Sequence, residues 1–317
     1  MTQTDVLHEN HGTGLLRAAL VGLTLDPAQV TVVSGQELTS AAGRRRVVRY
    51  VVEGLDPTGP AQVIAKSFTE RRRAQLLCEH LQVLSRGPFA VGRFRVPELL
   101  AFLPQENLVL YRAGTGVPLS QLVENSVSLD GVRDAARWLA TLHMSHLQLP
   151  RSFDEVREVA STHAWAAVVG GHSPEVLEPA QRLASQWATF GPPSPAATHV
   201  PIHKDFHSGH VLVDDSVCVI DLDEARQGDR AFDLAHFCTY LEWQGDQDAV
   251  RREAFLQEYS SWTGWSDDGS FARYEAYTWL KIAKQLALRS GPCRTRIEPS
   301  GWEVGNAVAR GLTCLVR

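Results

Sequence analysis

Four side chains that could bind a metal ion or move a proton lie within residues 203–210. They are His203, Asp205, His207 and His210. Imidazole and carboxylate groups at such close spacing could hold zinc or a metal pair in a hydrolase. A carboxylate on such a loop could instead orient a hydroxyl group for phosphoryl transfer. The residues that follow the loop must decide between these two chemistries.

The segment after the loop predicts a β-hairpin that ends in a second carboxylate. Residues 211–213 (VLV) and 217–221 (VCVID) are apolar and flank a short polar turn, which is typical of two antiparallel strands. Such a hairpin would place Asp205 and Asp221 close together at its open end. One carboxylate could then contact an acceptor hydroxyl while the other binds Mg²⁺. Nothing downstream clearly supplies the distant ligands of a metal hydrolase, so phosphoryl transfer is favoured.

Residues 202–237 resemble the catalytic core of the aminoglycoside phosphotransferase family, which is related to choline kinases and more remotely to protein kinases. The family pattern is His-Gly-Asp-x-x-x-x-Asn, a hairpin, Ile-Asp and then Gly-Asp-x-x-x-Asp-Leu-Ala. It matches residues 203–210, 220–221 and 228–235 in order and spacing. The resemblance implies a bilobal, protein-kinase-like α+β fold. It also implies an O-phosphotransferase that uses ATP or GTP on the hydroxyl of an aminoglycoside-like antibiotic, a sugar or an amino alcohol.

The resemblance assigns roles within the matched segment. It makes Asp205 the catalytic aspartate, with His203 bracing the loop, and makes Asp221 the principal ligand of Mg²⁺. His210 replaces the asparagine that usually contacts the metal, and an imidazole there suits Mn²⁺ better than Mg²⁺. Lys204 replaces a common glycine, and its side chain could lie near the transferred phosphate or point to solvent. The departure at His210 also keeps open an alternative, a nucleotide-binding pseudokinase with a regulatory or scaffolding role.

Two aspartates further along the matched segment, Asp229 and Asp233, are expected to be structural. They would anchor the backbone near the catalytic loop.

The N-terminal part offers a weaker set of nucleotide-binding candidates. Lys66, in "VIAK", stands where a strand lysine would contact the nucleotide phosphates, and Glu79 follows at a spacing that could pair with it. Residues 34–45 would cover the nucleotide. Backbone groups near Tyr111 to Ala113 would meet the adenine edge.

The acceptor site is expected in the region that follows the matched motif. Glu242 could attract a cationic aminoglycoside, and Tyr240 and Trp243 could form an aromatic wall for a sugar ring or a quaternary amine. Asp223 is an additional acid that could touch metal or substrate. For each residue the alternative is plainer: acids on a helix are usually solvated, and aromatic rings usually fill cores.

The periodicity of the chain predicts a mainly β lobe followed by a helical lobe. Residues 1–112 would form the nucleotide-binding lobe and 113–317 the catalytic and substrate-binding lobe, with glycines near 112–117 as a hinge. The predicted strands are 29–35, 45–54, 62–68 and two within 97–113, and the predicted helices are 14–23, 70–85, 129–147, 274–290 and 302–315.

Composition excludes several other classes. The formal charge of -5 without a basic stripe gives no support for nucleic-acid binding. No apolar run reaches membrane-spanning length and no signal-peptide pattern opens the chain, so a cytoplasmic protein without a membrane partner is expected. Five scattered cysteines suggest reduced thiols. The expected partner is a small hydroxyl compound, and the expected state is a monomer or a homodimer.

Overall fold

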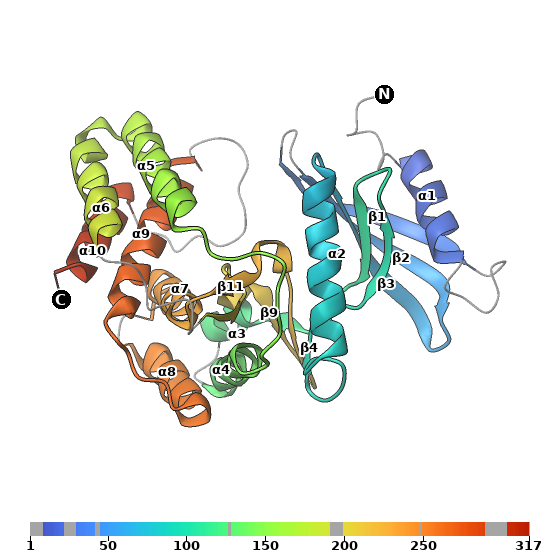
Figure 1. Cartoon of the computed structure of the whole chain (residues 1–317). Helices are drawn as coiled ribbons and strands as arrows, with labels where there is room; N and C mark the ends of the chain where they lie inside the picture. Colours follow the sequence, from blue (N-terminus) through green and yellow to red (C-terminus); the bar gives the residue numbers. More distant parts are fainter. Residues whose placement is uncertain are drawn as a thin grey trace. The chain divides into compact units, whose positions relative to one another are not determined.

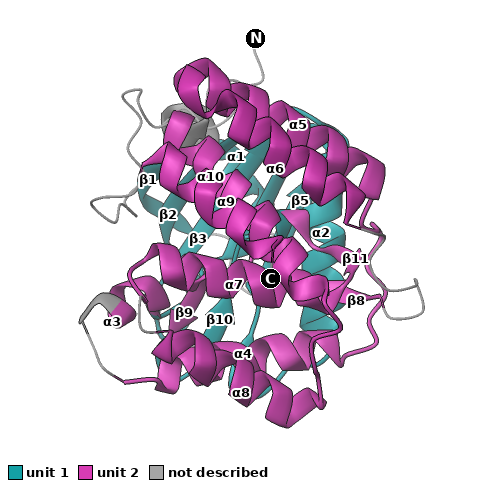
Figure 2. Ribbon diagram, turned by 90° about the vertical axis from the view of Figure 1, so that its left-hand side faces the viewer, with its two compact units in different colours: residues 1–116, 214–223 teal, residues 117–213, 224–317 magenta. Residues whose placement is uncertain are grey.

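The computed structural model describes residues 9–21, 30–41, 45–125, 128–190, 199–246, 249–288 and 303–316. Residues 42–44 of the predicted nucleotide-covering loop lie outside this part. The chain forms two compact units, drawn in different colours in Figure 2. Unit 1 comprises residues 1–116 and 214–223, and unit 2 comprises residues 117–213 and 224–317. The predicted fold class is confirmed: the chain is a mixed α+β protein with its large sheet in the N-terminal region (Figure 1).

Unit 1 is built on a five-stranded antiparallel sheet with the order β1-β2-β3-β6-β5. Its elements are α1 (Glu9–Val21), β1 (Thr31–Ala41), β2 (Arg45–Asp56), β3 (Gly59–Phe68), α2 (Arg71–Arg86), β4 (Phe94–Arg95), β5 (Leu99–Leu103), β6 (Leu108–Arg112) and β10 (Val217–Val219). The short strand β10 returns from far along the chain and pairs in parallel with β4. This return brings residues 220–223 into the same unit as the sheet.

Alternation along the strands decides which side chains the sheet buries. Val63 and Ala65 of β3 belong to a core cluster together with Leu16 and Leu20 of α1. Because successive side chains of a strand point to opposite faces, Lys66 points to the face away from this cluster. A lysine is therefore presented on the sheet face that α1 does not cover.

Unit 2 is helical, with short strands that frame the motif loop. Its elements are β7 (Val117–Pro118), α3 (Leu119–Asn125), α4 (Asp130–His143), α5 (Glu155–His172), α6 (Leu177–Thr189), β8 (Val200–Ile202), β9 (Val211–Val213), β11 (Arg226–Gly228), α7 (Arg230–Trp243), α8 (Val250–Thr263), α9 (Ser270–Leu288) and α10 (Val304–Cys314), with short 3₁₀ turns between them. Strand β8 pairs with β11 in antiparallel register, so both ends of the matched motif meet at one small sheet.

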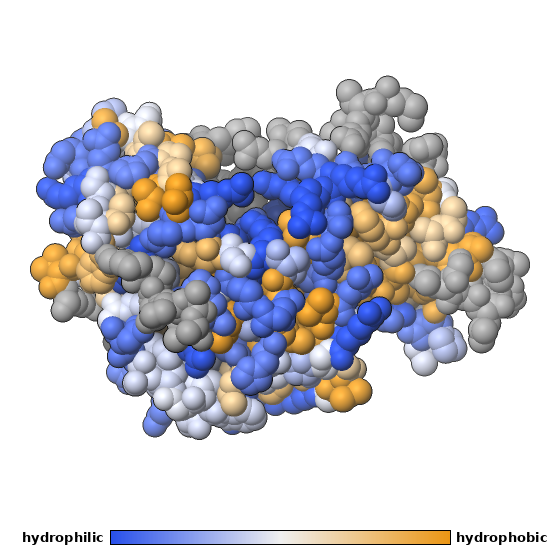
Figure 3. All heavy atoms as spheres, viewed as in Figure 1, coloured by the Kyte–Doolittle hydropathy of each residue, from blue (hydrophilic) through white to orange (hydrophobic). Residues whose placement is uncertain are grey.

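Large aromatic side chains fill the interior of unit 2. Trp138, Trp187 and Trp279 are each no more than 1% exposed, and burial of such rings dominates core energetics. Figure 3 shows mainly hydrophilic and intermediate side chains over the visible face of α8. Among the described residues, no helix combines the length and the apolar character that crossing a membrane requires.

Candidate active site

In unit 1, Lys66 lies between two carboxylates. Its ammonium nitrogen Nζ is 2.7 Å from Oδ1 of Asp221 and 2.7 Å from Oδ1 of Asp223. Arg45 adds a second cation, 3.3 Å from Oδ2 of Asp223. The backbone of Asp221 is in the left-handed region, with φ 63°, which aspartate tolerates better than most residues. The sheet and the segment after β10 thus bring together two acids and two bases.

The charges of this group depend on one another. Burial alone would lower the pKa of Lys66, but Asp221 and Asp223 outweigh it and raise that pKa. Burial raises the pKa of Asp223, against the opposing effect of Lys66. Carboxylate oxygens are the hard donors that Mg²⁺ prefers, and two of them converge here on a single cation. The donor set of this group therefore fits a divalent metal ion.

Glu79 does not pair with Lys66 in this structure. Its carboxylate accepts a hydrogen bond from Gln75 at 2.7 Å and lies 3.7 Å from Arg72, both on its own helix α2. The next residue, His80, is fully buried and its Nδ1 lies 2.9 Å from the carbonyl oxygen of Leu222. The helix therefore reaches the Asp221–Asp223 segment through His80, which the spacing argument missed because it considered only charge pairing.

The predicted adenine contacts lie on β6 and the residues after it. The Ala113 amide already donates to the carbonyl oxygen of Gln62 at 2.9 Å, and the Arg112 amide donates to that of Glu98 at 2.8 Å. The Tyr111 side chain is half-buried near Lys66, and desolvation raises the pKa of its hydroxyl. A nucleotide base would therefore have to use carbonyl groups here, or a rearranged backbone.

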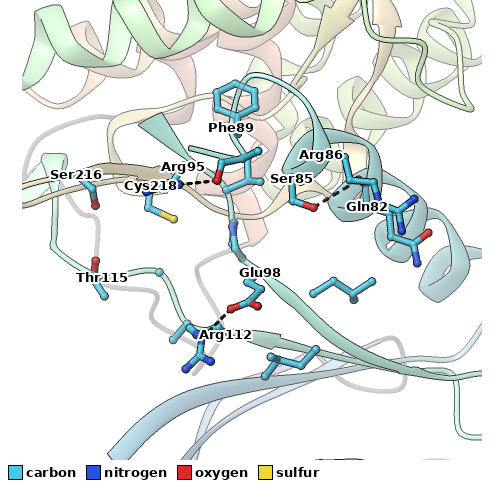
Figure 4. A pocket seen from close by; sticks show the side chains of 17 residues that line it. Gln82, Ser85, Arg86, Phe89, Arg95, Glu98, Arg112, Thr115, Ser216 and Cys218 are labelled. Carbon is cyan, nitrogen blue, oxygen red and sulfur yellow. Dashed lines mark hydrogen bonds and ion pairs between the residues drawn. The ribbon is translucent and has the colours of Figure 1, made fainter. Parts of the chain in front are cut away.

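A pocket of about 760 Å³ lies beside this linker, between the end of α2, β5 and β10 (Figure 4). Ala113 and Thr115 line it, but Lys66, Asp221 and Asp223 do not. The pocket is consequently a separate hollow of unit 1 and does not contain the phosphate-binding candidates.

In unit 2, Asp233 anchors the motif loop from α7. Its two carboxylate oxygens accept hydrogen bonds from the backbone amides of His203 at 2.6 Å and Lys204 at 2.7 Å. Asp229 caps the same helix by accepting from the Ala231 amide at 2.9 Å. His203 is fully buried, and its Nδ1 accepts from the Asp205 amide at 3.2 Å. The anchoring expected of Asp233 is confirmed, whereas Asp229 holds the first turn of α7.

The Lys204 side chain does not point to solvent, since it is only 12% exposed. Its Nζ lies 2.8 Å from Oε1 of Glu158 on α5 and 5.7 Å from the centre of the Phe232 ring. Its backbone has φ 67°, a conformation that glycine adopts without strain. This explains why a glycine suits this position and why a lysine here needs the hydrogen bond to Asp233 and the ion pair.

Asp205 is held by two side chains that the sequence argument did not single out. Lys281 of α9 places its Nζ 2.6 Å from Oδ1 of Asp205, and Nε2 of His236 lies 3.2 Å from the same oxygen. Burial works to raise the pKa of Asp205, but Lys281 and His236 outweigh it and hold that pKa well below its usual range. The carboxylate is therefore charged, partly exposed and fixed in orientation.

The histidines of the loop have different environments. His207 is buried, accepts a hydrogen bond from the Gly209 amide at 3.1 Å and stacks on Tyr240 with ring centres 4.7 Å apart. Burial and neighbouring cations keep the pKa of His207 well below its usual range. His210 places Nδ1 2.9 Å from the carbonyl oxygen of Asp205 and 3.9 Å from its Oδ2.

Asp205, His207 and His210 are close enough to be considered as a metal site. Their candidate donor atoms lie within 4.8 Å of one another. However, this cluster has a single carboxylate, whose charge the Lys281 ammonium already balances, and Nδ1 of His207 already accepts from the Gly209 amide. The surroundings thus favour an orienting carboxylate over a zinc hydrolase centre.

Most of the residues expected to recognise the acceptor are instead buried or paired within unit 2. Trp243 is 1% exposed and Tyr240 is 4% exposed, so both rings belong to the core and form no open wall. Glu242 pairs with Arg310 of α10. The plainer sequence interpretation therefore describes Tyr240 and Trp243, whereas Glu242 is neither solvated nor open to an acceptor in this unit.

Comparison with known proteins identifies the class. Residues 38–273 match the model of the phosphotransferase enzyme family, APH, so the chain belongs to this family. It is a phosphotransferase that acts on a hydroxyl group. No curated protein matches the chain.

Solved structures with the same fold are small-molecule kinases. The choline kinase LicA from Streptococcus pneumoniae has a TM-score of 0.65 at 15% identity, covering 97% of this chain and 99% of that one. The amicoumacin kinase hAmiN has a TM-score of 0.59 at 16% identity, covering 99% and 96%. A spectinomycin phosphotransferase has a TM-score of 0.57 at 12% identity, covering 95% and 98%. These similarities show a shared protein-kinase-like fold.

Proposed function

We propose that the protein transfers the γ-phosphoryl group of ATP or GTP to a hydroxyl group of a small molecule. The observation that carries the proposal is the group Lys66, Asp221 and Asp223, in which a buried ammonium and two carboxylates converge within 2.7 Å contacts. A lysine suits a nucleotide phosphate, and the carboxylates suit its metal ion. The structures of hAmiN with AMP-PNP and Ca²⁺ and of LicA with AMP support nucleotide binding on this fold.

The transfer step assigns a role to Asp205. The acceptor oxygen forms a bond to the γ-phosphorus while the bond from that phosphorus to the β–γ bridging oxygen breaks, and the nucleoside diphosphate leaves. Oδ2 of Asp205 orients the acceptor hydroxyl and accepts its proton late in the step. A strong base is unnecessary because the transition state of phosphoryl transfer is loose. The low pKa of Asp205 is therefore compatible with this role.

A divalent ion bound at Asp221 and Asp223 would neutralise charge on the nucleotide phosphates. The predicted ligand His210 belongs to unit 2, and its contribution stays a prediction. Residues of this chain supply the rest of the chemistry: Lys66 holds phosphate, and Asp205 orients the acceptor.

The proposal is tested by separating binding from turnover. Asp205→Asn should leave nucleotide affinity within about twofold and lower kcat by about a hundredfold, because orientation is lost. Asp221→Asn should weaken Mg²⁺-dependent nucleotide binding itself. Calorimetry and a labelled-phosphate assay measure the two effects. Nucleotide binding without turnover in any metal, with a broad panel of hydroxyl compounds, would instead establish the pseudokinase alternative.

A further inference from the structure

Unit 2 contains three of the few lysines of the chain, and they lie close to the Asp205 loop or on α9. Only four of the 31 basic residues of the chain are lysines, namely Lys66, Lys204, Lys281 and Lys284. Every other basic residue of the chain is an arginine. The compact ammonium group, which acts as a point charge, is therefore confined to these four positions.

Of the two lysines of α9, one has an acid partner and the other does not. Lys281 pairs with Asp205 at 2.6 Å. Lys284 follows one turn later on the same helix, and its Nζ lies 5.3 Å from the centre of the Trp165 ring. Within the described part of the chain, Lys284 has no carboxylate within ion-pair distance. Two cations spaced three residues apart on a helix repel each other, so this face favours an additional anion.

The other acids of unit 2 near this site are already engaged. Glu158 pairs with Lys204 and Arg226, and Glu224 pairs with Arg226. Glu242 pairs with Arg310. The acids that would attract a polycationic aminoglycoside are thus neutralised by neighbouring cations of the same unit.

We propose that the acceptor of this phosphotransferase carries an anionic group, a carboxylate or a phosphate, which Lys284 binds beside the hydroxyl that Asp205 orients. This inference rests on the proposed function and names its substrate class. The Lys281 ammonium has three N–H donors, and one of them is directed at Asp205. Lys281 is thus a positioning residue for Asp205 that can also contact the acceptor anion.

Matched compounds that differ in charge test the proposal. The assay follows labelled phosphate from ATP with Mg²⁺ or Mn²⁺ and two series of acceptors: gluconate, glucose and glucosamine, and glycerate, glycerol and 2-amino-1,3-propanediol. Glycerol 3-phosphate is the phosphate-bearing probe. We expect an anionic member to have the highest kcat/KM in at least one series.

Lys284 variants then identify the cause of that preference. Lys284→Met keeps an unbranched side chain but removes the charge, including its contact with the Trp165 ring. It should raise KM for the anionic acceptor by about tenfold to a hundredfold while KM for ATP and kcat change little. Lys284→Arg is the matched control and should restore most of the lost affinity. In the Met variant the advantage of the anionic compound over its neutral counterpart should disappear.

The outcomes distinguish this inference from the proposed function. If an amino or a neutral compound has the highest kcat/KM in both series, the anionic acceptor is overturned and the phosphotransferase proposal still stands. Preference for an anion that survives in Lys284→Met would also overturn it, because the charge of Lys284 would then play no part. If the protein binds ATP but transfers phosphate to none of the compounds, the result contradicts the proposed function. It then also contradicts this inference, which rests on that function.

Discussion

Lys66 illustrates how one buried ammonium organises the proposed nucleotide site. It is 3% exposed, and both of its carboxylate partners come from a segment more than 150 residues away in the sequence. We expect Lys66→Met to weaken Mg-ATP binding by about tenfold or more, since a charge-assisted contact to phosphate is lost. Calorimetry measures the effect. Arg46→Met, which removes a half-buried charge paired with Glu37 on the neighbouring strand, is the control and should bind normally; equal affinity in both variants would remove Lys66 from the site.

Lys204 allows strain and ion pairing to be compared directly. Its left-handed backbone costs about 1–2 kcal/mol, so glycine would relieve strain. Loss of the buried partner of Glu158 costs about 3–5 kcal/mol, although Arg226 still lies 3.4 Å from Glu158 and offsets part of it. The loss of the ion pair should outweigh the relief of strain, so Lys204→Gly should lower the free energy of unfolding by about 1–3 kcal/mol.

Urea unfolding measures this change in Lys204→Gly. The double variant Lys204→Gly with Glu158→Gln should recover most of the loss, since no unpaired buried charge then remains. A single Lys204→Gly variant that is more stable than the native protein would mean that backbone strain outweighs the ion pair.

His210 is the residue at which this chain departs from the asparagine of its family. If its imidazole contributes to the metal site, Mn²⁺ should support activity relatively better here than an amide ligand would allow. His210→Asn should retain turnover and shift the preference toward Mg²⁺. The ratio of kcat/KM with Mg²⁺ to that with Mn²⁺ measures this. An unchanged ratio would show that His210 only hydrogen-bonds within the loop.

At the scale of elements, α7 fixes the catalytic loop through a single carboxylate. Asp233 is fully buried and accepts two backbone amides with its two oxygens. An asparagine at this position could accept with only one oxygen, so Asp233→Asn leaves one buried amide unsatisfied. We expect kcat to fall by about a hundredfold and stability to fall by about 2–4 kcal/mol. Unchanged kcat in a folded Asp233→Asn variant would contradict this anchoring role.

The elements that could be predicted are those with a clear period. The predicted strand 45–54 and helix 70–85 agree with β2 (Arg45–Asp56) and α2 (Arg71–Arg86) to within about two residues, because alternation and amphipathicity were both strong. Helix α7 escaped prediction because it is buried on nearly every side, so it lacks a polar face. Strands β8 and β11 are three residues long and have no periodic signal.

The sequence indicated those parts of the candidate site that are local and missed the contacts that come from distant parts of the chain. The motif spacing indicated Asp205 and Asp221, but it could not show that Lys281 would reach Asp205 from α9, 76 residues further along the chain. A signal was present: Lys281 follows Tyr277 by four residues, on the same buried face of the helix. A lysine at a position where helical periodicity requires an apolar residue indicates a buried partner.

At the scale of the whole molecule, buried histidines make stability sensitive to acid. His143, His207 and His236 of unit 2 are all buried, and burial is the main cause that lowers the pKa of each. For His236 the pKa falls from 6.5 to about 4. In the unfolded chain these groups bind protons near pH 6.5, whereas in the folded protein they stay neutral to lower pH.

The sign of the effect follows from this difference in protons bound. Above about pH 6.5 both states are neutral and stability is complete, and as the pH falls toward 4 the unfolded state gains protons first and stability is lost. His236 alone should account for about 3 kcal/mol between pH 6.5 and 4. The midpoint of urea unfolding, measured at intervals across this range, should therefore decrease steadily. His236→Gln should flatten the decrease, whereas His163→Gln, at an exposed position on α5, should leave it unchanged; equal slopes in the two variants would show that His236 does not remain neutral in the folded protein.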